Sequence, residues 1–143
     1  APAPFEPSRS LAAALLNPTR LYVRPLLQTL ARAPGIRALA HITGGGYPEN
    51  LPRVIYEGLT VLLDLDAFAP PPVFSWLASA GAIAEDEMLR TFNCGSGMAV
   101  FVSQEREAET REALALAGLA PTLIGRLVPS RGLRVVTEGR LAL

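Results

Sequence analysis

Apolar and polar positions follow two different spacings along the chain, and each spacing predicts its own kind of element. Short apolar runs, several of them bounded by glycine or proline, predict about five strands, in residues 36–42, 59–65, 97–103, 121–128 and 133–138. Apolar residues three and four apart predict about four helices, in residues 24–33, 70–81, 85–92 and 104–118. Strands and helices do not alternate strictly. We therefore predict an α+β fold, with one mixed sheet of about five strands flanked by about four helices.

Local chemistry sets the boundaries of these helices. Pro25 has no N–H to donate and is favoured in a first helical turn, which starts the helix at 24–33. Its spacing places Leu26, Leu27 and Leu30 on one face, and we expect that face to be buried. The helix at 104–118 is expected to be capped by Ser103 before it and ended by Gly118.

The first residues differ in character from the rest of the chain. Three prolines fall within the first seven residues, and there is no initiating methionine. We interpret residues 1–14 as a linker or domain edge and residues 15–143 as a single domain, and we expect the chain to be a fragment of a longer protein. Residues 10–18 are expected to form a helical turn or an extended arm, and residues 19–23 to be extended.

Composition narrows the class of protein. Thirteen acidic residues balance thirteen basic ones, and the charges are scattered, which disfavours binding to nucleic acid or to an anionic membrane surface. A single cysteine, Cys94, rules out an internal disulfide framework and fits a reducing cytoplasm. No apolar run is long enough to cross a bilayer.

The most informative stretch is "HITGGGYPENLPRV", residues 41–54. Three consecutive glycines permit positive φ and let backbone N–H groups converge on an anion without steric cost. Thr43 can add a hydroxyl donor, and His41 can donate a hydrogen bond or carry a proton near neutral pH. The residues alone leave two possibilities open, a phosphate-binding loop or a tight exit from a strand. The loop is not a P-loop, because the Gly-Lys-Ser/Thr ending is absent.

A second stretch, "RTFNCGSGMAV", has glycines on both sides of Ser96 at the start of a strand. Glycines there indicate that the backbone closely approaches a neighbouring strand or a ligand. Asn93 beside this turn can orient a ligand or cap the strand. We expect Cys94 to be an inert, partly buried thiol, because nothing nearby in the sequence would lower its pKa.

Neither the acidic nor the aromatic residues indicate a separate site. Carboxylates at residues 64 and 66 and at 85–87 suit magnesium, but acidic residues at a helix start are explained by the helix dipole, so we predict no metal ligands. We assign Tyr22, Phe74 and Trp76 to the core.

Four stretches carry a resemblance to a known family. "LNPTRLYVRPLL", "AHITGGGYPENLPRV", "VFSWLASAGAIAEDEMLRTFNCGSGMAVFVS" and "LIGRLV" resemble, in order and spacing, the C-terminal domain of phosphoribosylformylglycinamidine cyclo-ligase, also called aminoimidazole ribonucleotide synthetase. The similarity implies an ATP-dependent ring closure in purine biosynthesis by a cytoplasmic homodimer. It also implies that an N-terminal domain, whose motifs are absent from these residues, supplies most of the contacts to ATP and Mg²⁺. We expect the chain alone to be inactive, and "SLAAALL" to pack differently without that domain.

The resemblance also implies a ribonucleotide site on residues 41–54. It gives His41 an orienting or proton-handling role. The residues it implies for substrate or phosphate binding are Thr43, Gly44, Gly45, Gly46, Glu49, Asn50, Arg53 and Asn93. Among them, Glu49, Asn50 and Arg53 are expected to support the loop, while Arg20 and Cys94 are weaker candidates.

Two other classes stay open. The same domain type occurs in selenophosphate synthetase, thiamine-monophosphate kinase and a hydrogenase-maturation protein, and the Pro-Glu-Asn-Leu-Pro-Arg-Val run discriminates against them. The other alternative is a non-enzymatic interaction domain that has kept the fold.

Overall fold

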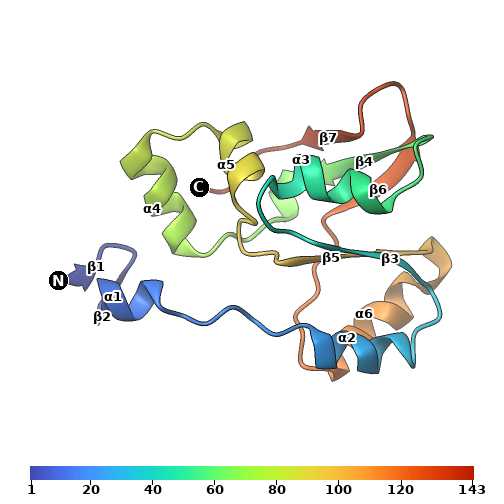
Figure 1. The fold of residues 1–143 in the computed structure, drawn as a ribbon, viewed down its shortest axis with the longest axis horizontal. Coiled ribbons are helices and arrows are strands. Elements are labelled where there is room, and N and C mark those ends of the chain that lie inside the picture. Colours follow the sequence, from blue (N-terminus) through green and yellow to red (C-terminus); the bar gives the residue numbers. More distant parts are fainter.

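The computed structural model describes all 143 residues, and the chain forms short helices and strands in small sheets joined by irregular segments (Figure 1). The strands are β1 (Pro2–Ala3), β2 (Glu6–Ser10), β3 (Ile36–His41), β4 (Leu59–Asp64), β5 (Met98–Val102), β6 (Gly125–Pro129) and β7 (Val135–Glu138). The α-helices are α1 (Leu11–Leu15), α2 (Val23–Leu30), α3 (Gly46–Asn50), α4 (Pro72–Gly81), α5 (Glu85–Thr91) and α6 (Glu107–Leu116). Short 3₁₀ turns lie at η1 (Leu51–Val54), η2 (Leu65–Ala67) and η3 (Gln104–Arg106).

The mixed α and β character is confirmed, but the strands do not form one sheet. β3 pairs antiparallel with β5, while β4 lies between an antiparallel β6 and a parallel β7. The short β1 and β2 form a separate hairpin. All five predicted strands are present. Their division into a pair and a triplet is a tertiary choice that apolar runs do not encode, because periodicity identifies a strand without identifying its neighbour.

The main core lies among β3, β4, α3 and α5. Twelve buried residues form it, from Ala40 in β3 to Leu141 near the C-terminus. Tyr47 is fully buried and meets Phe68 edge-on, with ring centroids 5.3 Å apart. Contacts between α3 and α5 bring the segment after β3 against the helix before β5, so the two stretches that the sequence singled out are held together by this core.

α2 differs from the prediction in the face that it buries. The helix forms with Pro25 in its first turn, but it ends at Leu30. Leu26 is 6% exposed, whereas Leu27 is 62% and Leu30 is 44% exposed, so the prediction that these two leucines are buried is wrong. Thr29 is buried in their place, and its hydroxyl donates to the Pro25 carbonyl over 2.9 Å. α2 packs against α6 along this narrower face, and Figure 1 shows the two helices side by side.

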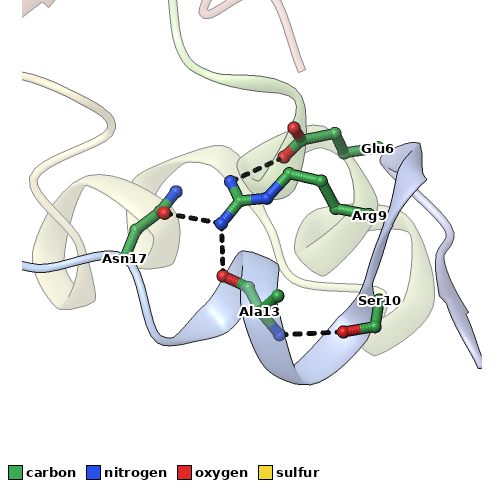
Figure 2. Close-up of polar contacts among 5 residues, drawn as sticks. All are labelled: Glu6, Arg9, Ser10, Ala13 and Asn17. Atoms are coloured by element: carbon green, nitrogen blue, oxygen red, sulfur yellow. Dashed lines mark hydrogen bonds and ion pairs between the residues drawn. The ribbon is translucent and has the colours of Figure 1, made fainter.

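The N-terminal residues form a small unit of their own. Arg9 holds it together, because its guanidinium pairs with Glu6, donates to the Ala13 carbonyl and donates to Asn17 Oδ1 (Figure 2). Ser10 caps α1 by accepting from Ala13 N. The unit reaches α4 through its aromatic ring at Phe5, whose centroid lies 5.3 Å from that of Trp76.

The helical turn predicted within residues 10–18 is confirmed as α1. Residues 19–23 carry no strand, so their predicted extended character is not realised as sheet pairing. Residues 19–22 belong to the irregular connection that leads from the N-terminal unit to α2, and Val23 is the first residue of that helix (Figure 1). A strand needs a paired neighbour, and this segment has none.

Two further boundary predictions have different outcomes. Gly118 follows α6 with a φ of +81°, as a helix-ending glycine should. Ser103 does not cap a helix with its side chain, since a 3₁₀ turn intervenes before α6 and the Ser103 carbonyl accepts from Arg106 N. The cap prediction is therefore wrong.

Residues after β7 return to the core. Leu141 N donates to Glu85 Oε2 over 2.7 Å, and Arg140 N donates to Asp66 Oδ1 over 3.0 Å. Leu141 is itself part of the core cluster. The tail is thereby tied to the first turn of α5 and to the 3₁₀ turn after β4. None of the helices is both long enough and apolar enough to span a membrane.

Candidate functional site

The glycine-rich loop leaves β3 and enters α3. Ile42 N donates to the Gly97 carbonyl, which extends the pairing of β3 with the start of β5, and Gly46 N then donates to the Thr43 carbonyl to close the turn. Gly45 and Gly46 have φ values of +90° and +54°. Both lie in the left-handed region that a side chain disfavours. The predicted strand exit thus exists and needs glycine at two positions.

Gly44, the first of the three glycines, has no such structural reason. A Cβ on Gly46 would fall well inside contact with the Leu89 carbonyl, and one on Gly45 would lie 2.6 Å from Glu49 Cδ. A Cβ on Gly44 would meet nothing within 4 Å, and Gly44 does not have a positive φ. Packing and backbone conformation therefore explain Gly45 and Gly46 but leave Gly44 unexplained.

Asn50 holds the loop from behind. Its buried amide nitrogen lies 3.3 Å from the Thr43 carbonyl, 3.2 Å from that of Gly44 and 2.7 Å from that of Gly46. Carbonyls gathered on one buried donor are turned toward the inside of the molecule. A planar amide sets the positions of the three oxygens together.

Arg53 and Glu49 complete this support. Arg53 Nη1 donates to Asn50 Oδ1 over 3.1 Å, and Arg53 Nη2 lies 3.6 Å from Glu49 Oε2. The ion pair is more than half exposed on both sides, so it contributes little stability by itself. It does neutralise the guanidinium locally, and these three side chains lie where the sequence expected loop support.

The outer side of the loop is open. His41, Thr43 and Gly44 are exposed. The backbone N–H groups of Thr43, Gly44 and Gly45 donate to no acceptor within the chain. Three successive unpaired N–H donors on an exposed turn can bind an anionic group.

The turn before β5 forms the neighbouring wall. Asn93 Oδ1 accepts from Gly95 N over 3.0 Å, and the Asn93 carbonyl accepts from the buried Tyr47 hydroxyl over 2.6 Å. Burial raises the pKa of Tyr47 well above its ordinary range, so this hydroxyl remains a donor. Asn93 thus caps its turn with its oxygen and keeps its amide nitrogen free.

Cys94 lies on the inside of this turn. It is 2% exposed at a φ of +46°, and its Sγ lies 3.8 Å from the Met88 carbonyl. Burial raises the pKa of the thiol to about 11. A protonated, enclosed thiol is a poor nucleophile, which agrees with the inert role expected for it.

The glycines around Ser96 approach other parts of the same chain. A Cβ on Gly95 would meet the Pro71 ring, and one on Gly97 would lie 2.6 Å from the Tyr22 hydroxyl. The sequence analysis expected a neighbouring strand or a ligand beside these glycines. The residues found there, Pro71 before α4 and Tyr22 before α2, belong to no strand, so both glycines pack against other segments of the same chain.

Thr43 and Asn93 are brought together at a pocket of about 290 Å³ beside the glycine loop. Its lining residues are Ile42, Thr43, Phe74, Thr91, Phe92 and Asn93. Four of the six, Ile42, Phe74, Thr91 and Phe92, were not expected from the sequence as site residues. Phe74, assigned there to the core, is only half-buried and meets Phe92 edge-on at 5.9 Å. Thr91 and Phe92 directly precede Asn93 in the motif "RTFNCG", and that adjacency is the signal that would have found them.

His41 is positioned apart from this pocket. It ends β3 opposite Met98, and its ring lies 6.3 Å from that of Tyr22 in an edge-on arrangement. It is not among the residues that line the pocket. Arg20 is exposed in the irregular segment before α2 and likewise does not line it.

No three carboxylate, histidine or cysteine side chains come together as a metal site. The acidic groups considered for magnesium accept from backbone N–H groups instead, Asp64 from Asp66 N and Glu85 from Leu141 N. These residues do not fit a Mg²⁺ centre held by this chain.

The family described as "AIR synthase related protein, C-terminal domain" matches residues 2–138. The match includes the glycine loop, its support and the pocket.

Proposed function

The chain belongs to the AIR synthase related family as a C-terminal domain, and from this premise we propose that it is the substrate-side domain of a phosphoribosylformylglycinamidine cyclo-ligase. Members of the family are enzymes that use ATP. Within it, the Pro-Glu-Asn-Leu-Pro-Arg-Val run at residues 48–54 supports the purine cyclo-ligase over the other members.

The observation that carries the proposal is the openness of Gly44. Gly45 and Gly46 are required by the fold, whereas Gly44 meets nothing within 4 Å and has ordinary φ. A glycine without an internal reason, flanked by unpaired N–H groups, leaves room for a ligand to approach the backbone. The phosphate of a ribonucleotide supplies the acceptor oxygens that such donors need.

The side chains around the loop have different roles, since Asn50 and Arg53 support the loop and His41 contacts the substrate. Asn50, supported by Arg53, holds the carbonyls inward, so the N–H groups of the turn need not reorganise when an anion arrives. Exposed His41 is free to donate to the substrate or to take a proton during ring closure. In the proposed reaction an amidine nitrogen attacks the formyl carbon after its oxygen is phosphorylated, and inorganic phosphate leaves.

We assign ATP and Mg²⁺, which supply the phosphoryl group and screen its charge, to a separate ATP-binding domain of a cytoplasmic homodimer. Support for such a domain comes from a run of exposed apolar side chains: Leu15, Leu16, Leu21, Val23, Leu27 and Leu30. Soluble surfaces rarely leave so many large apolar groups uncovered in one stretch. Two of them, Leu15 and Leu16, belong to the stretch "SLAAALL", which is expected to pack differently without that domain.

The test is turnover by the complete enzyme that contains this chain. ADP release should depend on formylglycinamidine ribonucleotide, and residues 1–143 alone should give none. Release that depends instead on selenide, thiamine monophosphate or a hydrogenase-maturation substrate would contradict the proposal, as would a complete protein that hydrolyses ATP with none of them.

Two substitutions in the complete enzyme test individual roles. His41→Ala should lower kcat by about a hundredfold if His41 handles a proton, and an unchanged kcat would remove it from the mechanism. Cys94→Ser should leave kcat and KM nearly unchanged, and a large loss would show that the thiol does take part.

A further inference from the structure

Tyr22 and Gly97 fit closely against each other at the end of the β3–β5 ladder. A Cβ on Gly97 would lie 2.6 Å from the Tyr22 hydroxyl oxygen and 3.1 and 3.2 Å from two carbons of the ring. Gly97 does not have a positive φ, so its backbone conformation does not require glycine. The close approach of the Tyr22 ring is therefore the structural reason for a glycine at residue 97.

The Tyr22 side chain does not serve the helix that it precedes. α2 begins at Val23, and Tyr22 occupies the N-cap position without a side-chain hydrogen bond to the helix. Its carbonyl accepts from Leu26 N over 2.9 Å, which a residue of any type can do. The phenol hydroxyl makes no hydrogen bond within the chain. Packing of the half-buried ring thus decides where this side chain lies.

His41 lies at the same end of the ladder, and its ring has Tyr22 as an aromatic neighbour. His41 pairs with Met98, and the next residue, Ile42, donates to the Gly97 carbonyl. No hydrogen bond or ion pair within the chain holds the exposed imidazole. The two ring centroids are 6.3 Å apart and the ring planes meet at 65°, which is the geometry of a favourable edge-on pair.

We infer that Tyr22 is a positioning residue for His41. The missing side chain of Gly97 lets the Tyr22 ring lie against the ladder, and the ring restricts the directions that the imidazole can take. The inference rests on the proposed function, in which His41 donates to the substrate or takes a proton during ring closure. That role needs the imidazole at a fixed place beside the reacting atoms, and here aromatic packing supplies the restraint that hydrogen bonds do not.

The first test is a double-mutant cycle in the complete enzyme, with kcat and KM measured for formylglycinamidine ribonucleotide. Tyr22→Leu removes the aromatic ring and should lower kcat about three- to tenfold with KM nearly unchanged. Tyr22→Phe keeps the ring and should stay within about twofold of the parent's kcat. In the His41→Ala background, Tyr22→Leu should lower kcat no further, because no imidazole is left to position.

Gly97→Ala tests the same contact without altering either ring. The new methyl group would overlap the free end of the Tyr22 side chain rather than backbone atoms, so the ring is displaced while the fold is kept. We expect kcat to fall about as far as in Tyr22→Leu. Combining the two substitutions should cost no more than one of them, because leucine leaves the space that the methyl group needs.

A spectroscopic readout makes the test independent of turnover. His41 is the only histidine among the 143 residues, so the nuclear magnetic resonance signals of its ring protons are identified without ambiguity in this chain. These signals should shift in Tyr22→Leu and in Gly97→Ala, since both substitutions remove or displace the neighbouring ring. They should shift much less in Tyr22→Phe, which keeps an aromatic ring at the same place.

The inference and the proposed function fail in different ways. An unchanged kcat in His41→Ala would remove His41 from the mechanism, and the positioning role with it. If His41→Ala does lower kcat, an unaffected Tyr22→Leu or Gly97→Ala variant, or an equal loss from Tyr22→Leu in both backgrounds, would overturn the positioning role alone. A loss in Tyr22→Phe as large as that in Tyr22→Leu, or His41 ring signals that do not shift, would overturn it as well.

Discussion

The inner and outer sides of the glycine loop use similar residues for opposite purposes. The inner side, Gly46, Tyr47 and Asn50, is buried, and each residue meets a specific partner in α5, in the turn before β5 or in the loop itself. On the outer side, Thr43 and Gly44 are exposed and their N–H groups have no partner. A shared sequence motif therefore contains two classes of position, and substitutions on the two sides should report on different properties.

Gly46→Ala should have the largest effect on folding. The new Cβ would overlap the Leu89 carbonyl, lie 2.8 Å from Arg90 O and require a φ of +54° for alanine. Strain of both kinds together should lower the free energy of unfolding by about 3 kcal/mol or more. Urea denaturation followed by circular dichroism measures it. A loss below about 1 kcal/mol would show that α3 and α5 can separate, and the inner side would lose its structural definition.

Asn50→Asp comes next. A carboxylate would replace the amide donor opposite three carbonyl oxygens, in a site where Asn50 is 5% exposed. Loss of the donor and burial of acceptors against acceptors should cost about 2–4 kcal/mol at neutral pH. Arg53→Ala is the control, since it removes only a half-exposed partner and should cost less than about 1 kcal/mol. Equal losses would mean that Asn50 acts through Arg53 rather than through the loop carbonyls.

Cys94, in the turn before β5, is buried like the inner side of the loop, and its thiol makes the stability of the chain depend on pH. Burial raises the pKa of the thiol from 9.0 to about 11, so the unfolded chain releases this proton first as pH rises. The free energy of unfolding is therefore unaffected by this thiol below pH 9. Between pH 9 and about pH 11 it falls progressively, by at most about 2 to 3 kcal/mol.

Cys94→Ser should remove that component. Unfolding free energies measured between pH 8 and 11 should fall less steeply in the variant than in the parent. Burial raises the pKa of Tyr47 too, and the nearby Cys94 adds to that shift, so the difference between the two curves reports the thiol together with its effect on Tyr47. Identical slopes would contradict the assignment.

Gly44→Ala should have the smallest effect on stability. No atom lies within 4 Å of the new methyl group and φ is not positive, so the free energy of unfolding should change by less than about 0.5 kcal/mol. Affinity for inorganic phosphate should nevertheless fall, because the methyl group occupies the open side of the loop. Unchanged phosphate binding would show that the outer side of the loop does not bind phosphate, and neither folding nor binding would then explain a glycine at residue 44.

Much of this fold follows from short-range patterns. Apolar runs located β3, β4 and β5, and the chemistry of Pro25 and Gly118 set helix limits that hold in the structure. These features depend on residues close in sequence, where backbone sterics and side-chain spacing decide the outcome.

Apart from the local cap expected at Ser103, the errors come from residues far apart in sequence. Leu27 and Leu30 have the right spacing for a buried face, yet α2 presents Leu26 and Thr29 inward because of where α6 lies. The candidate site shows the same division. The sequence located Asn50 and Asn93, but it did not show that one holds the loop while the other joins Thr43 at a pocket with Phe74.

The return of the C-terminal tail links distant parts of the chain into one cooperative unit. Leu141 N is held by Glu85 at the start of α5, and the other end of α5 carries Thr91 at the pocket and the carbonyl groups against which Gly46 packs. Opening of the tail and loosening of the loop are thus coupled through a single short helix. In a hydrogen-exchange experiment, the amides of α5 and of residues 46–50 should lose protection together when the last residues are removed.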